Sequence, residues 1–380
     1  ATWAEAFFRA SEKTSVAQSV MIDAAVLAIL VFTSGASAIG QTLADCKFVA
    51  SQFLNTCIHG NYDTAAADVA SMQALQVTCN DQSRRASTRC TSLGGVLTGT
   101  TCAWSRKLCV TCRSDNGVTK IRVQTNNMPN HCIQSSSVKP QIFDYEVVFN
   151  QKNTHGTWVQ SFADQGALDG AVCPIHKTFT KAALGMVEFG TAESSRAMGF
   201  ALNGVAFQFA NMMHDDPVYP KAVYNEQPLD ICLGHNQLNS ASGMYHYHDV
   251  SPCINPFFLL GKTMSECISN AQCKSDIVAW ALSGFEGWQG KKVIGLAKDG
   301  HVMYGPYNDQ GMLWSTVDVD ACNGAWSADK SEYFYVGTQW HPYAVGCQGP
   351  SNFPHIDHSL YANCSRNSMK VYANEVTLHQ

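Results

Sequence analysis

The pattern of hydrophobic and polar positions changes character near Asn126. Before it, the stretch from about Trp3 to Phe53 is rich in Ala and Leu and lacks Pro, which predicts helix with a break near residues 34–35. A second helix is predicted from Thr64 to Val77. After Asn126, short alternating apolar and polar runs with frequent aromatics, Gly and Asn predict strands joined by long loops.

The most apolar segment is Ala24–Ala44, which has no charged side chain between Asp23 and Asp45. A signal peptide is one interpretation, because a cleavage-like Ala-Ser-Ala follows the apolar run, but no Lys or Arg accompanies Asp23 as an n-region requires. A membrane span is another, although its second half is rich in small residues that favour packing against protein. We expect a helix that is buried in protein or packed within an oligomer.

Sixteen cysteines spread from Cys46 to Cys364 without the tight pairs of a zinc ribbon, which is typical of disulfides in an oxidising compartment. Those from Cys79 to Cys132, together with turn residues such as Asp115-Asn116-Gly117, predict a small disulfide-held region with a hairpin. The Cys-x-x-Cys at positions 109–112 could be redox-active or half of a zinc site. In a chain this rich in cysteine we interpret it as structural.

Composition narrows the class of protein. The 380 residues are 46% hydrophobic, which is enough for a buried core, and the net charge of −5 comes with no basic patch for nucleic acid. Charged residues make up 14%, well under the roughly 25% usual for soluble domains. A surface so poor in charge suits a protein covered by glycan or by neighbouring subunits. Asn363 begins the one Asn-x-Ser/Thr sequon and is the candidate glycan site.

The C-terminal region contains two halves that match in order. Residues 199–204 (Gly-Phe-Ala-Leu-Asn-Gly) pair with 295–300 (Gly-Leu-Ala-Lys-Asp-Gly), so each half has an apolar strand that ends in a hairpin-type turn. Residues 229–234, with Asp-x-Cys-x-Gly, pair with 319–324. Tyr-His-Tyr-His at 245–248 pairs with Tyr-Phe-Tyr-Val at 333–336. The sequence therefore predicts an internal pseudo-twofold repeat.

The same elements resemble the YHYH family. They are Pro-Asn-His at 129–131, the Ala-Leu-Asn-Gly strand, Asp-x-Cys-x-Gly-His at 230–235, the namesake Tyr245–His248, and the later Tyr-Gly-Pro at 304–306 and Pro-Tyr at 342–343. The resemblance covers about residues 126–350 and does not reach the region before about residue 120. It implies a fold and a site, and no activity common to the family.

The fold class predicted for the chain is α+β. Residues 1–60 form a hydrophobic helical segment for assembly or anchoring, 61–125 a small cysteine-rich region, and 126–380 a mainly β domain similar to the YHYH family. A helix-like insert from about Met264 to Leu282 interrupts the β pattern and carries Cys267 and Cys273.

The namesake motif offers metal-ligand chemistry. Alternate residues of a strand share a face, so His246 and His248 project to one side about 6 to 7 Å apart while the two tyrosines project to the other. A third imidazole from His235 completes a three-histidine site of the type that suits copper or zinc. The alternative is that these are buried imidazoles that hydrogen-bond strand ends.

The second half supports a special role for the histidines. Its equivalents of the three histidine positions are Ala325, Phe334 and Val336, whereas both tyrosines recur. The tyrosines are therefore interpreted as scaffold, and the histidines as serving something that only one half needs. Candidates for a fourth ligand are His131, His214 and Asp215.

Other polar groups have simpler interpretations. His341, His355 and His358 near the C-terminus are assigned to a surface loop. Asp230 and Asp320 precede a Cys at equivalent positions, which favours turn capping over an acid–base pair. The signatures of serine hydrolases, zinc proteases, P-loops and EF-hands are missing from the sequence, and no catalytic residue is assigned.

These observations predict a secreted, extracellular or cell-surface protein with a structural or binding role. It is expected to be a disulfide-rich glycoprotein that self-assembles into a homo-oligomer or filament through its N-terminal helix, with copper or zinc at the histidines. A metal-dependent extracellular enzyme that uses the same histidines is the first alternative. A membrane-anchored ectodomain, based on Ala24–Ala44 alone, is the second.

Overall fold

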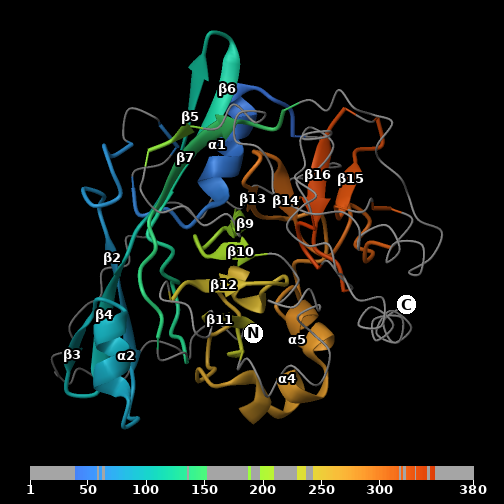
Figure 1. The fold of residues 1–380 in the computed structure, drawn as a ribbon. Coiled ribbons are helices and arrows are strands. Elements are labelled where there is room, and N and C mark those ends of the chain that lie inside the picture. Colours follow the sequence, from blue (N-terminus) through green and yellow to red (C-terminus); the bar gives the residue numbers. More distant parts are fainter. Residues whose placement is uncertain are drawn as a thin grey trace, which may run out of the picture. The chain divides into compact units, whose positions relative to one another are not determined.

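A computed structural model describes residues 39–57, 60–61, 65–134, 137–151, 187–189, 197–208, 229–236, 243–315, 318–319, 322–329, 331–339 and 343–346, as Figure 1 shows. All of them belong to one compact unit, Ala36–Gln380. The helix predicted before residue 39, most of the apolar segment 24–44, the glycan site Asn363 and the C-terminal histidines 341, 355 and 358 lie outside the described residues.

Helix α1 spans Leu43–Gln52 and follows directly from its sequence. Thr42 and Asp45 form a capping box, in which each side chain binds the other's backbone N–H, so two otherwise unpaired donors are satisfied. The helix turns Cys46, Val49 and Ala50 inward, and all three are fully buried. It ends next to the predicted boundary at Phe53.

The helix predicted over Thr64–Val77 is wrong. Residues 65–74 form turns and bends, and strand β2 occupies Leu75–Asn80. β2 pairs in antiparallel fashion with β4 (Thr101–Arg106), which places Cys79 opposite Cys102. Pairing across the chain therefore outweighed the local preference of an Ala-rich segment for helix.

The N-terminal half forms two sheets. A three-stranded sheet has the order β2-β4-β3, with β3 at Val96–Thr98 and helix α2 at Ala86–Ser92 beside it in the chain. A five-stranded sheet has the order β1-β5-β6-β7-β8. Its strands are β1 (Gly60–Asn61), β5 (Leu108–Asp115), β6 (Val118–Thr125), β7 (Phe143–Val148) and β8 (Val187–Glu188).

The predicted hairpin at residues 115–117 is confirmed. Asp115 pairs with Val118 across a two-residue turn, and both turn residues have positive φ, 51° at Asn116 and 82° at Gly117. Asn-Gly is the dipeptide that adopts this turn with least strain.

Disulfides join the described cysteines into a network. The bonds between two described cysteines are Cys46–Cys112, Cys57–Cys109, Cys79–Cys132, Cys90–Cys102, Cys232–Cys253 and Cys267–Cys273, and Cys322 is disulfide-bonded too. Cys109 and Cys112 bond to different partners near α1 and not to each other. The structural interpretation of this Cys-x-x-Cys is therefore confirmed, and the redox and zinc interpretations are excluded, because neither sulfur is a free thiol.

An eight-stranded sheet follows, in the order β11-β12-β10-β9-β13-β14-β16-β15. Its first four strands along the chain are β9 (Ala197–Ala201), β10 (Ala206–Gln208), β11 (Gly234–Asn236) and β12 (Tyr245–Tyr247). Its last four are β13 (Val293–Ala297), β14 (Val302–Tyr304), β15 (Gly324–Trp326) and β16 (Tyr333–Val336). β9 and β13 meet antiparallel at the centre, with Phe200 opposite Leu296.

The two sets of four strands pair in the same orientation and register. β9–β10 and β13–β14 are antiparallel, whereas β10–β12 and β14–β16 are parallel. Gly234 lies opposite Tyr247 in the β11–β12 hairpin, and Gly324 lies opposite Tyr335 in β15–β16. The turns predicted at the ends of two apolar strands are confirmed, because Gly204 and Gly300 have φ of 85° and 90°.

The insert between β12 and β13 contains short helices where one helix-like segment was predicted. After 3-10 turns at Pro252–Ile254 and Cys267–Ser269, α4 spans Ala271–Ser275 and α5 spans Ile277–Ser283. The side chain of Asp276 accepts a hydrogen bond from the N–H of Ala279, so it caps α5 and separates it from α4.

Contacts between the five-stranded and eight-stranded sheets form much of the core. The rings of Phe143 and Phe200 meet edge to face, 4.9 Å apart. The N–H of Asn150 donates to the carbonyl oxygen of Gly300 at 2.9 Å, and a Cβ at Gly300 would collide with the Val148 carbonyl. These contacts place β9 and β10 in the interior, where every residue of both strands is buried.

Candidate metal centre

The β11–β12 hairpin positions the four residues of the Tyr-His-Tyr-His motif. His235 on β11 pairs directly with His246 on β12. Leu233, at φ 59°, turns the chain into β11, and Gly234 leaves room for the ring of Tyr245, which a Cβ at this position would overlap. The strand thereby sends its tyrosines to one face and its histidines to the other, as predicted.

Three imidazoles converge on the histidine face. Nε2 of His248 lies 3.0 Å from Nε2 of His246 and 3.0 Å from Nε2 of His235. All three side chains are buried, between 1% and 4% exposed. The structure therefore brings together the three residues that the sequence singled out, with the same ring atom of each directed to one point.

The hydrogen bond made by Nδ1 of a histidine ring determines whether Nε2 has a lone pair available. Nδ1 of His246 lies 2.9 Å from the Met244 carbonyl oxygen, so Nδ1 must carry the proton and donate. In the neutral ring this leaves Nε2 with a lone pair directed at the other two imidazoles, as in a metal-bound histidine. Burial, with His246 and His248 nearby, holds the pKa of His235 well below its usual value, so the His235 ring is neutral.

Three imidazoles at these distances suit a bound cation. Nitrogen ligands of a tetrahedral zinc or copper ion lie little more than about 3 Å apart when each is about 2 Å from the metal. Nδ1 of His235 is buried and has no hydrogen-bond partner among the described residues, so no second bond anchors its tautomer. Within the described part of the chain, this cluster contains no further His, Cys, Asp or Glu.

Comparison with known protein families supports the identity of this region. Residues 178–330 match the family model described as YHYH protein, a stretch that includes the histidine hairpin and most of the eight-stranded sheet. The chain carries a YHYH domain. No curated protein and no solved structure matches the chain.

The tyrosine face of the YHYH domain is a scaffold of hydrogen bonds. Tyr245 donates to Oδ2 of Asp230 at 2.8 Å, while Oδ1 of Asp230 accepts from the N–H groups of Cys232 and Gly234. Asp230 thus caps the turn, as its repetition predicted. Burial raises the pKa of Asp230 to about 7, against the effect of these donors. Its predicted counterpart, Asp320, lies outside the described residues.

His131 belongs to this tyrosine face and does not join the histidine cluster. Nδ1 donates to the Cys132 carbonyl oxygen at 2.8 Å, so Nε2 accepts from the Tyr247 hydroxyl at 2.9 Å. Tyr247 in turn accepts from the side-chain amide of Asn203 at 3.0 Å. The suggestion that His131 supplies a fourth ligand is therefore wrong, because β12 separates it from the cluster. His214 and Asp215 lie outside the described residues.

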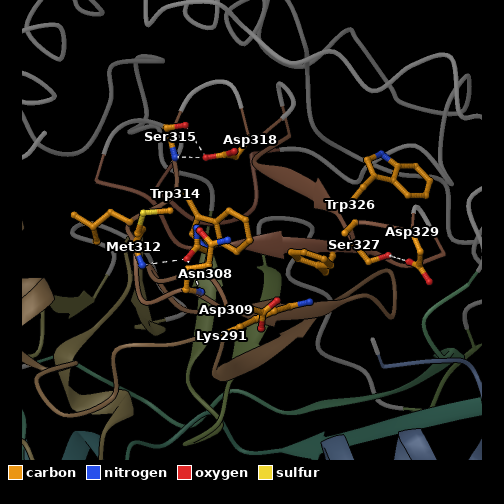
Figure 2. Close-up of a pocket in the computed structure, with 14 residues that line it drawn as sticks. Lys291, Asn308, Asp309, Met312, Trp314, Ser315, Asp318, Trp326, Ser327 and Asp329 are labelled. Atoms are coloured by element: carbon orange, nitrogen blue, oxygen red, sulfur yellow. Dashed lines mark hydrogen bonds between the residues drawn. The ribbon is translucent and has the colours of Figure 1, made fainter. Parts of the chain in front are cut away.

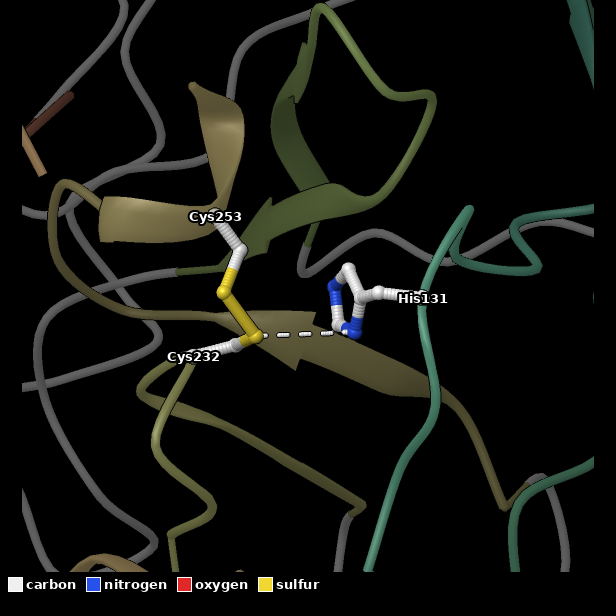
Figure 3. Close-up of side chains that lie close together, drawn as sticks. All are labelled: His131, Cys232 and Cys253. Carbon is white, nitrogen blue, oxygen red and sulfur yellow. Dashed lines mark hydrogen bonds between the residues drawn. A yellow bond between two sulfur atoms is a disulfide. The ribbon is translucent and has the colours of Figure 1, made fainter. Parts of the chain in front are cut away.

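A second group that could be mistaken for a metal site surrounds His131. His131, Cys232 and Cys253 lie together, and Figure 3 shows the bond between the two sulfurs. Sulfur binds metal as a thiolate, and neither sulfur of a disulfide is one. Nδ1 of His131 lies 3.5 Å from Sγ of Cys232 and is already engaged with the Cys132 carbonyl. This group is a packing contact.

The buried His131 predicts a specific pH dependence. Burial lowers its pKa to about 4 from an ordinary 6.5. As pH falls below 6.5 the unfolded chain takes up this proton first, so stability is lost down to about pH 4, by about 3 kcal/mol. Urea unfolding of wild type and His131→Asn at pH 4 to 7 measures this loss as the difference between the two stability curves. Asp230, whose raised pKa makes stability change in the opposite direction with pH, contributes equally to both proteins and cancels. Parallel curves would show that His131 does not titrate in this way.

One further buried histidine could not be singled out from the sequence. His301, at the β13–β14 turn, is fully buried, with Nδ1 3.2 Å from Oδ2 of Asp299, which also accepts from the Tyr335 hydroxyl at 2.6 Å. Asp299 raises the pKa of His301 despite its burial. His301 contacts the two tyrosines of β16, Tyr333 and Tyr335. His131 contacts the two tyrosines of β12, Tyr245 and Tyr247, in a similar way. The two histidines are unrelated in sequence position, so no motif could have linked them.

Proposed function

We propose that this is an extracellular binding or structural protein whose YHYH domain holds one zinc or copper ion through Nε2 of His235, His246 and His248. The observation that carries the proposal is the convergence of the three Nε2 atoms, each 3.0 Å from a neighbour, in a buried site. Imidazole nitrogen is a preferred donor for both metals, whereas calcium and magnesium prefer oxygen.

The surroundings support a metal over a purely structural cluster. The proton of a neutral His246 ring is committed to Nδ1, so its Nε2 is an acceptor and not a donor toward the other two imidazoles. A bound cation would accept the Nε2 lone pairs at one point, and its binding energy would add to the stability of the fold. The second half keeps the strand register and replaces these positions by Ala325, Phe334 and Val336, so the fold itself does not require imidazoles there.

Disulfide bonding supports the extracellular location. Every described cysteine is bonded, which is typical of proteins that mature in an oxidising compartment. In the part of the chain that the structure describes, no helix has the length and apolar character of a membrane span.

The internal repeat is part of the proposal. The matching orientation and register of β9–β12 and β13–β16 support an origin by duplication, after which only the first half acquired or kept the histidines. Self-assembly through the apolar segment 24–44 is proposed on the low charge content alone. A metalloenzyme with the same ligands is the alternative, and it requires a coordination position that external ligands such as azide can occupy.

Elemental analysis of protein purified without chelator tests the metal site. Wild type is expected to hold about one zinc or copper ion per chain, and the His246→Ala, His248→Ala double variant close to none. His131→Asn is the matched control, since it also removes a buried imidazole but leaves the cluster intact, and it should retain the metal. Metal-free wild type, or a double variant that keeps its metal, would contradict the proposal. A sizing run of the same samples tests self-assembly, which a monomeric wild type would contradict.

A further inference from the structure

The second half of the eight-stranded sheet carries a cavity with no role in the metal site. It measures about 820 Å³, within the range of small-molecule binding sites. Its lining comes from residues 308–310 and 312–315, Asp318, the segment 326–329, Lys291 and Phe334, and Figure 2 shows these residues around it.

Two strands that line the cavity, β15 and β16, correspond to the β11–β12 hairpin that carries the histidines. Phe334 pairs with Ala325 as His246 pairs with His235, and Trp326 holds the register position of Asn236. The equivalent hairpin is thus used differently in the two halves. In the first half it directs imidazoles to one point, and in the second it contributes aromatic side chains to a cavity.

Two tryptophans contribute flat rings to the apolar part of the lining, and both are held in place. The indole N–H of Trp314 donates to the Gly305 carbonyl oxygen at 3.1 Å, and its ring lies 5.9 Å from that of Phe334. The ring of Trp326 packs against Tyr333, with centroids 5.5 Å apart. Both side chains remain partly exposed, so part of each ring surface is open to a ligand.

Polar groups on short turns supply the rest of the lining. Oδ1 of Asn308 accepts from the N–H groups of Gln310 and Met312, which fixes the side chain and leaves its amide nitrogen as a donor. Asp318 is held by Ser315, and Asp329 by Ser327. Asp309 has no hydrogen-bond or ion-pair partner among the described residues. The site therefore combines oriented acceptors and a donor with flat apolar surfaces.

This combination excludes several ligand classes. An anion would be repelled by the carboxylates of Asp309, Asp318 and Asp329. The aromatic face of Phe334 is not open to a cationic ligand, because the ammonium of Lys291 already lies over it at 3.8 Å. A wholly apolar ligand would strip water from the carboxylates without replacing their hydrogen bonds.

We propose that this cavity binds a neutral saccharide. A pyranose has C–H faces that pack against aromatic rings and hydroxyl edges that donate to carboxylates and accept from an amide, so it matches both parts of the lining. Free polysaccharides and the glycans of glycoproteins share this chemistry. The proposal is independent of the metal site, because none of His235, His246 and His248 lines the cavity.

Isothermal titration with neutral hexasaccharides of glucose, mannose, xylose and N-acetylglucosamine, and with a released N-glycan, tests the proposal. At least one is expected to bind one-to-one, and which one distinguishes a polysaccharide from a glycoprotein source. Trp314→Ala should weaken binding by roughly tenfold or more, as removal of a central aromatic contact does. Asp309→Ala, which removes no described contact of the fold, should weaken it several-fold.

Phe257→Ala is the control, since Phe257 is an exposed aromatic outside the cavity, and it should bind as wild type does. Failure of every saccharide to bind would overturn the proposal, as would binding that both cavity variants leave unchanged. Binding of tetramethylammonium in place of the saccharides would also overturn it and assign the cavity to a cation.

Discussion

Replacing Cys46, Cys57, Cys109 and Cys112 together by Ala is expected to cost about 7 kcal/mol of folding stability, which is most of what a typical domain has. These cysteines form two disulfides that tie the region of α1 to β5. Cys57–Cys109 closes a span of 52 residues, for which chain entropy gives about 4 kcal/mol. With that bond present, Cys46–Cys112 closes a loop of only about 14 residues (11 from 46 to 57 and 3 from 109 to 112), or about 3 kcal/mol.

Urea unfolding of the variants separates these contributions. The Cys46→Ala, Cys112→Ala pair alone should lose about 3 kcal/mol. Removing Cys267–Cys273, which spans 6 residues, is the comparison and should cost about 2 kcal/mol. If removal of Cys267–Cys273 lowered the stability as much as removal of Cys46–Cys112 and Cys57–Cys109 together, loop entropy would not be how these disulfides stabilise the fold.

Gly234→Ala is expected to destabilise the protein by about 3 kcal/mol and to abolish metal binding. The new methyl group would overlap the hydroxyl end of Tyr245, which cannot move aside without breaking its bond to the buried Asp230. His235 is the next residue, so a shift of β11 displaces one of the three imidazoles. In Gly324→Ala the new methyl group would overlap the hydroxyl end of Tyr333 in the same way. This variant should lose similar stability but keep the metal.

Thermal unfolding and metal content of the two variants test this prediction. Gly290→Ala is the control, because a Cβ there meets no atom within 4 Å, and it should behave as wild type. A Gly234→Ala protein with wild-type stability would mean that the Tyr245–Asp230 contact yields easily. Loss of metal from Gly324→Ala would mean that the two halves are not independent.

The sequence predicted those parts of the fold that local chemistry determines. The Asn116-Gly117 hairpin and the turns at Gly204 and Gly300 are dictated by residues that accept positive φ. Strand alternation was enough to place His246 and His248 on one face. The helix expected at Thr64–Val77 failed because its outcome depended on pairing with β4, more than 20 residues further along the chain.

The rest of the site depends on contacts between distant segments. His131 lies on a loop more than 100 residues before the motif, and only the packed structure shows that it accepts from Tyr247 and not from a metal. His301 occupies a comparable place in the second half without any match in sequence position. The cavity beside Trp314 and Trp326 is assembled from turns whose spacing has no pattern. No periodicity or motif carries information of this kind.

X-ray absorption at the K-edge of the bound metal tests the central claim most directly, because it reports the ligands themselves. The proposed site predicts three imidazole nitrogens at about 2.0 to 2.1 Å from the metal and no sulfur, with the imidazole signal reduced in His248→Ala. Sulfur at about 2.3 Å, or a shell of oxygen atoms alone, would contradict the assignment of the metal to His235, His246 and His248.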